Sequence, residues 1–287
     1  MPGKTAAKRS DGRIHDEMRA LYVIYEGLDR VDGSARFGFG DTKAIASLSG
    51  PIEVRLAAEQ PSKATFEVNI RPLSNVPGTE SKSLSASLRS LFAPSLILSR
   101  NPRTLIQLVI QSLTPSPAPR FQYSLIAAFI NASTLAILNA GSVPMSGVIC
   151  AVAIGRLPLP ENSATSERAL FLDPTDKELL SADGGGCFAF MFASDFGDTG
   201  GLVPVCKMVW TNWTATAGVF DEDELLRAKE LAKRGAEQVW TKIKASVEYM
   251  DRSRPVPLHA LAPSQSQEQD VPMAVEEAED DDAKMEI

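Results

Sequence analysis

Residues 124–140 constrain the fold more than any other part of the chain. The segment reads Ser-Leu-Ile-Ala-Ala-Phe-Ile-Asn-Ala-Ser-Thr-Leu-Ala-Ile-Leu-Asn-Ala, so apolar or small residues occupy nearly every side of a helix built from it. This composition predicts a helix that is buried on most faces, because a surface helix would keep a polar stripe. Gly141 follows and can take the left-handed conformation that ends many helices.

Short runs rich in Val, Ile and aromatic residues, bounded by Gly, Pro or Asp, predict strands around this helix. Residues 31–34 and 40–41 predict tight turns between the first strands, and the prolines of 115–119 end a later one. The predicted strands are 21–25, 33–39, 42–48, 52–57, 65–70, 104–113, 148–154, 169–172, 187–193 and 205–211.

Two further helices are predicted from periodicity. Residues 81–92 place leucines at helical spacing and end at Ala93-Pro94. After Asp221 and Glu224, which resemble a capping box, apolar residues recur every three or four positions through residue 247. The order of strands and helices predicts an α+β domain in which helices cover one face of a mixed sheet.

The charge is divided unevenly along the 287 residues. Residues 262–287 carry nine acids against the single base Lys284, a net charge of −8, which leaves +1 for the rest of a chain whose total is −7. This acidic tail has no aromatic residue and cannot repay the entropy of ordering. We therefore expect a flexible amino terminus over 1–10, a single domain over 11–252 and a disordered acidic tail over 253–287.

The composition excludes several classes of protein. The longest apolar runs, 125–130 and 148–154, are too short to span a bilayer, so no membrane association is expected. Three cysteines (Cys150, Cys187 and Cys206) without C-x-x-C spacing, together with two histidines, argue against a disulfide framework or a zinc site. The best fit is a reducing compartment.

Motifs of nucleotide binding, metalloproteases and serine hydrolases are absent from the sequence. Gly184-Gly-Gly186 precedes a predicted strand, whereas a phosphate-binding loop lies between a strand and a helix. Asp173, Asp176, Glu178 and Asp183 could form a carboxylate set for a metal or a solvated turn around Pro174, and we favour the turn. We therefore expect no metal and no cofactor.

A string of motifs between about residues 10 and 250 resembles the ribonuclease PH family, and within it the eukaryotic subunits of the exosome ring. The resemblance implies the family's fold, a mixed sheet packed against helices that is similar to domain 2 of ribosomal protein S5. The motifs are Ser10-Asp-Gly-Arg13, Asp16-Glu-x-Arg19, Gly33 to Lys43, Leu88 to Pro94, Pro102 to Gln111, Ile126 to Ala132, Gly141 to Met145 and Leu172-Asp-Pro-Thr175.

Active members of that family use inorganic phosphate to degrade RNA from its 3′ end. Such chemistry needs a fixed arginine to hold two anionic groups together, and acids for a metal or for proton transfer. The resemblance places the phosphate-binding arginine at Leu125, next to Ser124, and replaces a Gly-Gly pair by Gln122-Tyr123.

The acidic pair that the family uses is lost as well. Its two aspartates fall at Leu179 and at Gly185, or at Cys187 if two residues are inserted. We therefore expect no catalytic residue in this chain: the positions Leu125, Leu179, Gly185 and Cys187 are vacated.

The resemblance also implies partners and a location. It implies a heterohexameric ring with other ribonuclease PH-like exosome subunits, contact with cap and catalytic exosome subunits, RNA in a central channel, and a place in the nucleus, the nucleolus and the cytoplasm. Arg89 is the first candidate for RNA contact and Arg100 and Arg103 are weaker ones. For each of the three, the alternative is an ordinary surface or salt-bridged arginine.

Two other functions stay open on the sequence alone. The chain could be an active phosphorolytic or hydrolytic nuclease that works as a homodimer through Arg120, Asp176 and Asp183. It could also be an unrelated α+β binding module whose acidic tail engages a basic partner. The sequence does not say which ring subunits would flank the chain or whether the 115–119 insertion touches another protein.

Overall fold

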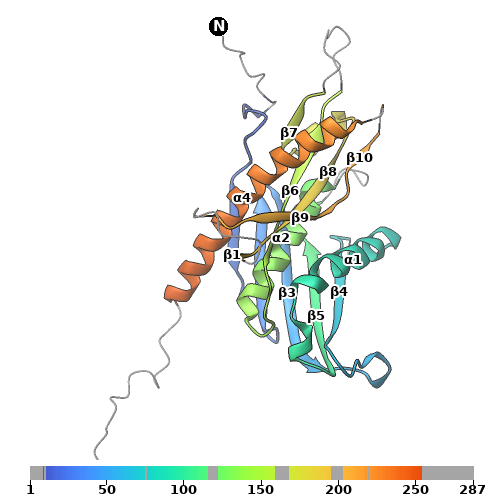
Figure 1. Cartoon of the computed structure of the whole chain (residues 1–287), viewed down its shortest axis with the longest axis vertical. Coiled ribbons are helices and arrows are strands. Elements are labelled where there is room, and N and C mark those ends of the chain that lie inside the picture. Colours follow the sequence, from blue (N-terminus) through green and yellow to red (C-terminus); the bar gives the residue numbers. More distant parts are fainter. Residues whose placement is uncertain are drawn as a thin grey trace, which may run out of the picture. The chain divides into compact units, whose positions relative to one another are not determined.

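In the computed structural model, the strands form two five-stranded sheets with a long apolar helix between them (Figure 1). The structure describes residues 9, 11–74, 76–115, 122–158, 168–194, 203–216, 218 and 220–253. The chain divides into a unit of residues 1–251 and a second unit of residues 252–287, and nearly all described residues belong to the first. The predicted acidic tail lies outside the described residues, apart from Ser253.

The first sheet has the order β1-β2-β3-β5-β4. Its pairs are antiparallel except β4 with β5, which is parallel. In β2 and β3 the alternate side chains of Phe37, Phe39, Ala44, Ala46 and Leu48 enter the core. The strands are β1 (Leu21–Tyr25), β2 (Gly33–Phe39), β3 (Thr42–Glu53), β4 (Thr65–Arg71) and β5 (Thr104–Ser112).

Helix α2 (Tyr123–Ala140) packs against both sheets, and residues 123–137 are all buried. Its length and apolarity would also suit a membrane span, but it is the core helix of this fold. Its buried polar residues hydrogen-bond to backbone groups at the edge of β6. The Asn131 amide donates to Ala151 O and accepts from Ala151 N, both at 2.8 Å. Thr134 donates to Ile149 O at 2.7 Å, so backbone groups that β7 leaves unpaired are satisfied by α2.

The second sheet is antiparallel throughout and lies under α4 (Glu222–Ser253). Gly235 of α4 sits against Leu172 and Val152, and Trp240 stacks on Phe192 with ring centroids 6.0 Å apart. The strands are β6 (Val148–Arg156), β7 (Leu170–Leu172), β8 (Gly184–Phe192), β9 (Cys206–Thr211) and β10 (Thr214–Ala215), with α3 (Asp176–Ser181) between β7 and β8.

Helix α1 (Thr79–Phe92) closes the free edge of β4. The hydroxyl of Ser85 accepts from Ile70 N at 3.2 Å and donates to Ser81 O at 2.7 Å. The edge is thereby covered at Ile70 by a helix rather than left open for pairing. Short 3-10 turns follow at Ala93–Ser95 and Leu98–Arg100 before β5 begins.

Most predicted elements are confirmed and the α+β class is correct, but several details were wrong. The strands form two sheets rather than one. Residues 52–57 are not a strand of their own: β3 continues to Glu53 past a register shift, and a 3-10 turn begins at Leu56. The tight turn predicted at 31–34 is wrong, since Gly33 and Ser34 belong to β2 and the turn is at residues 29–30.

The capping box predicted at the start of α4 forms only in part. Asp221 accepts from Glu224 N at 2.8 Å, as a capping residue does. The Glu224 carboxylate, however, binds the fully buried Arg156, with Nε 2.6 Å from Oε1. The buried guanidinium of Arg156 needs a counter-charge. The Glu224 carboxylate therefore pairs with Arg156 and does not accept the second hydrogen bond of a capping box.

Candidate functional site

The start of α2 borders a small hollow where the sequence placed the lost phosphate site. The hollow has a volume of about 10 Å³, room for about one water molecule. No basic side chain lines it among the described residues, and Leu125, 7% exposed, forms part of its wall. The hydroxyl of Ser124 donates its proton to Pro174 O at 2.8 Å, so it does not donate to an anion in the hollow. The lining residues are Thr42, Thr114, Pro115, Gln122, Ser124, Leu125, Asp176 and Leu179.

The ring of Tyr123 fills the adjoining space between α2, α3 and β8. Tyr123 is 3% exposed and packs in a small apolar cluster with Ala153 and Leu179. Its hydroxyl hydrogen-bonds to the Thr214 hydroxyl at 2.5 Å. Burial raises the pKa of Tyr123, and the bond to Thr214 offsets only part of that rise. The tyrosine that replaces a family glycine is therefore a packed, neutral wall of the site.

Gly185, a vacated acid position, cannot carry a side chain in this backbone. Its φ is +152°, and a Cβ added there would lie 2.4 Å from Ile154 O and 3.2 Å from Cε2 of Tyr123. An aspartate is thus excluded by the strand itself as well as by the tyrosine. The same close approach explains the run of three glycines as a packing requirement between β8, β6 and β10.

The other two vacated acid positions are buried in apolar surroundings. Leu179 is 1% exposed on α3. Cys187 is fully buried, and its backbone N–H donates to Asn212 Oδ1 at 2.6 Å. Burial raises the pKa of the Cys187 thiol, so it stays protonated and cannot act as an acid or a nucleophile near neutral pH.

Asp176 is the one acid among the described residues that line the hollow. It is half-buried, and burial raises the pKa of its carboxyl group. Arg19 lowers that pKa and Asp173 raises it further. Asp183, its partner in the nuclease alternative, is instead bound by an ion pair and hydrogen bond to Arg168. Arg120, the third member of that set, lies outside the described residues.

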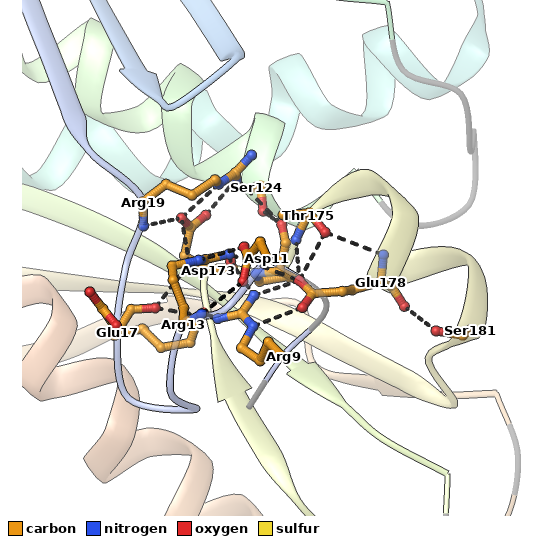
Figure 2. Close-up of polar contacts among 12 residues, drawn as sticks. Arg9, Asp11, Arg13, Glu17, Arg19, Ser124, Asp173, Thr175, Glu178 and Ser181 are labelled. Atoms are coloured by element: carbon orange, nitrogen blue, oxygen red, sulfur yellow. Dashed lines mark hydrogen bonds and ion pairs between the residues drawn. The ribbon is translucent and has the colours of Figure 1, made fainter. Parts of the chain in front are cut away.

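Three arginines of the amino-terminal segment bind the β7–α3 connection around Asp173 and Glu178 (Figure 2). We call Arg9, Arg13, Arg19, Asp173 and Glu178 the N-terminal clamp. Arg19 reaches Asp173 Oδ1 at 2.6 Å and Oδ2 at 2.8 Å. Arg9 reaches Glu178 Oε1 at 2.8 Å and Oε2 at 2.5 Å.

Backbone carbonyls complete the clamp. Arg9 donates to Leu172 O at 2.6 Å and to Asp173 O at 2.9 Å. Arg13 donates to Glu17 O at 2.9 Å, which ties the amino-terminal segment to itself. Arg9, 9% exposed, falls within the segment predicted to be flexible, yet it is among the most firmly held cations; for residues 1–8 and 10 the prediction lies outside the described residues.

In the cluster of Asp173, Asp176, Glu178 and Asp183, the clamp and a helix cap engage Glu178. Thr175 and Glu178 form a capping box at the start of α3: Thr175 N donates to Glu178 Oε2 at 2.8 Å and the Thr175 hydroxyl accepts from Glu178 N. Burial raises the pKa of Glu178, but hydrogen bonds from Arg9 and Thr175 outweigh it and the pKa is lowered. The described residues hold no group of three or more His, Cys, Asp or Glu placed to bind a metal ion.

Comparisons with known proteins agree with this fold and these motifs. A model of the 3′ exoribonuclease family, domain 1, matches residues 17–142. The exosome complex component RRP46 of Saccharomyces cerevisiae is 30% identical over 223 residues, which cover 77% of this chain and 92% of the yeast protein. The chain belongs to the ribonuclease PH family.

Two further similarities extend the comparison within the ribonuclease PH family. The exosome complex component Rrp41 of Archaeoglobus fulgidus is 30% identical over 241 residues, 81% of this chain and 83% of that protein. The crystal structure of rice (Oryza sativa) Rrp46 shares the fold with a TM-score of 0.68 and 22% identity, covering 84% of this chain and all of the rice chain. The expected resemblance to eukaryotic subunits of the exosome ring is confirmed.

The three arginines named as RNA-contact candidates lie on the surface of this ribonuclease PH-like domain. Arg89 is exposed in the last turn of α1, and Arg100 is exposed in the 3-10 turn that follows. Neither has an ion pair with another described residue. Arg103 has a φ of +62° and pairs with Glu59 at 3.4 Å, an ion pair that agrees with the salt-bridged alternative.

A larger groove of about 1120 Å³ opens on the other side of Leu125, between α1 and the start of α2. Its described lining is mostly apolar and includes Leu73, Leu84, Ile126 and Phe129, with Glu80 as its one charged residue. The sequence offered no signal for this groove, because residues that line it come from β4, α1, β5, α2 and β9.

Proposed function

We propose that this chain is a noncatalytic structural subunit of the ring of ribonuclease PH-like chains in the RNA exosome, where it forms part of the wall of the RNA channel. The observation that carries the proposal is the filled site: Leu125 stands where the phosphate-binding arginine would be, and Tyr123 with Gly185 leaves no space for an acid. A hollow of about 10 Å³ whose described lining has one acid and no base is too small for inorganic phosphate and repels its negative charge, so it cannot hold phosphate against a scissile phosphodiester.

A heteromeric ring explains how such a chain keeps its fold without catalysis. In a ring built from different chains, one subunit can lose its chemistry while its interfaces still close the assembly. Relatives named as exosome components match more than three quarters of this chain, which supports membership in such a ring. The proposed partners are other ribonuclease PH-like subunits, cap and catalytic exosome subunits, and RNA, with 3′-to-5′ RNA processing in the nucleus, nucleolus and cytoplasm as the setting.

Assembly is the first test. The full chain is mixed with candidate ribonuclease PH-like ring subunits and followed by size-exclusion chromatography. We expect a stable larger species with the correct partners and none with the chain alone. Failure to form a complex with any ribonuclease PH-like chain would overturn the proposed place in a ring.

Activity is the second test, and Asp176→Asn supplies its control. The purified chain is incubated with single-stranded RNA with and without inorganic phosphate, and nucleoside diphosphates are measured. We expect none above background from wild type or variant. Phosphate-dependent release that Asp176→Asn abolishes would overturn the proposal, whereas release that survives the substitution unchanged would come from a contaminating enzyme.

A further inference from the structure

One flank of α1 carries two cations on the side turned away from the apolar groove. Glu80, Leu84 and Ser87 line the groove, while Lys82 and Arg89 are seven residues apart and therefore share the opposite side of the helix. Both are exposed, and about 10 Å of helix axis separates them. The flank thus presents positive charge at two successive positions along one line.

A second hollow, of about 420 Å³, lies where this flank meets β4, which runs beside α1 (Figure 1). Arg71, the last residue of β4, and Lys82 both line it. The remaining lining is mixed, with polar Asn69, Ser81 and Ser85 beside apolar Ile70 and Pro77. Because Ser85 bonds both Ile70 N and Ser81 O, helix and strand are fixed to each other at this hollow.

The three cations are not neutralised within the described part of the chain. None of Arg71, Lys82 and Arg89 has an ion pair with a described acid. Glu80 faces the groove on the other side of α1, and Glu67 on β4 does not line the hollow. An uncompensated cluster of this kind, with an amide and hydroxyls beside it, suits an anion with several acceptor oxygens.

We propose that Arg71, Lys82 and Arg89 form a track for the phosphate backbone of single-stranded RNA, with one phosphate seated in the hollow between Arg71 and Lys82. The inference rests on the proposed function, since it assigns the part of this subunit that the RNA touches. RNA fits better than an acidic peptide, because the hollow has few apolar side chains to hold a peptide's side chains while the charges repeat along a line. Such contacts bind without reading bases.

The test uses the assembled ring that contains this full chain and a fluorescein-labelled 20-nucleotide oligoadenylate. Arg71→Gln with Lys82→Gln removes two charges and keeps a polar side chain at both positions and the helix propensity at 82. The Kd is measured by fluorescence anisotropy over a salt series. We expect affinity to fall about 10-fold and the slope of log K against log salt to become shallower by about 1.4, about 0.7 for each lost phosphate contact.

A matched control removes the same charge elsewhere. Arg55 and Lys63 are exposed and lie before the start of β4, at the end opposite to Arg71, so Arg55→Gln with Lys63→Gln should leave Kd and slope within about two-fold and about 0.3 of wild type. Equal effects of the two pairs, or none from either, in a ring that assembles and binds RNA, would overturn the track and leave the proposed function standing. A chain that joins no ring would instead remove the proposed function, and the track with it.

Discussion

The two sides of the β7–α3 connection differ in how their side chains are buried: charged residues are paired on one side, and apolar residues pack on the other. On one side Arg19 binds Asp173, and Arg9 binds Glu178, each through two hydrogen bonds to the carboxylate. On the other side, within the part of the chain that the structure describes, no cation lines the hollow beside Leu125 and Leu179, and Asp176 is its single acid. The chain retains charge where each ion has a partner and replaces it by apolar packing where the partner is missing.

The physical reason is the cost of an unpaired buried charge. Removing one partner of a buried pair leaves the other uncompensated, whereas replacing both by apolar groups is often neutral. An acid at 179 would share the hollow with a leucine at 125, so these two apolar replacements belong together. The clamp stabilises the fold, and the apolar packing around Leu125 and Tyr123 occupies the place of the phosphate site.

The largest effect is expected from breaking the clamp at Asp173. Asp173→Asn keeps size and the left-handed backbone, φ +48°, which asparagine tolerates, and leaves Arg19 without its counter-ion. We expect the free energy of unfolding to drop by about 4 kcal/mol. Urea denaturation measures it, and Asp11→Asn at the more exposed pair with Arg13 is the control, expected below about 1 kcal/mol. Equal losses would mean that burial does not set the strength of the clamp.

On the apolar side, Tyr123→Ala is expected to cost about 3 kcal/mol, because it opens a cavity between Leu179, Ala153 and Gly185. Tyr123→Phe keeps the ring and removes the hydrogen bond from the Tyr123 hydroxyl to Thr214, so about 1 kcal/mol is expected. Thermal unfolding of both variants separates ring packing from the hydroxyl. A phenylalanine variant as unstable as the alanine variant would contradict the packing role.

Glu178 and Asp176, two residues apart, should respond to pH with opposite signs. The lowered pKa of Glu178 means that its ionised form stabilises the fold above about pH 4.5 and that this is lost as pH falls through the folded pKa. Glu178→Gln should therefore cost about 2 kcal/mol at pH 7 and converge on wild type in acid.

The raised pKa of Asp176 means that its protonated form is favoured in the folded state, and this stabilisation is lost as pH rises from about 3.8 through the folded pKa. Asp176→Asn should be more stable than wild type at pH 7, by less than about 1 kcal/mol because the group is partly solvated, and equal to it in acid. Unfolding curves from pH 3 to 7 give both comparisons. If both variants differ from wild type in the same direction as the pH rises, the pKa shifts of Glu178 and Asp176 do not have opposite signs.

The smallest effect is expected at Arg103, which pairs with Glu59 on the surface. Its side chain is 70% exposed, so Arg103→Gln should change the free energy of unfolding by less than about 0.5 kcal/mol. In the assembled ring the same variant should bind oligoadenylate like wild type. A loss of RNA affinity there would return Arg103 to the set of RNA contacts.

The elements with local signals were predictable from the sequence. The α2 segment was predicted within one residue because its composition excludes solvent, and α4 because its apolar stripe repeats every three or four residues. Helix α3 was missed, since six residues show no period and its stability comes from the Thr175–Glu178 capping box and from Arg9. The hydrophobic run 52–57 was misread because the end of β3 depends on its pairing with β5.

The sequence by itself determined which charges are available: no arginine at 125, no acid at 179, 185 or 187, and an acidic tail after a nearly neutral domain. Only the tertiary structure decided that Tyr123 fills the space between α2, α3 and β8, that the backbone of Gly185 excludes any side chain, and that Arg9 and Arg19 meet acids more than 150 residues away. Residue identity is local, but burial, strand register and long-range ion pairing depend on how distant segments pack, and periodicity carries no record of that packing.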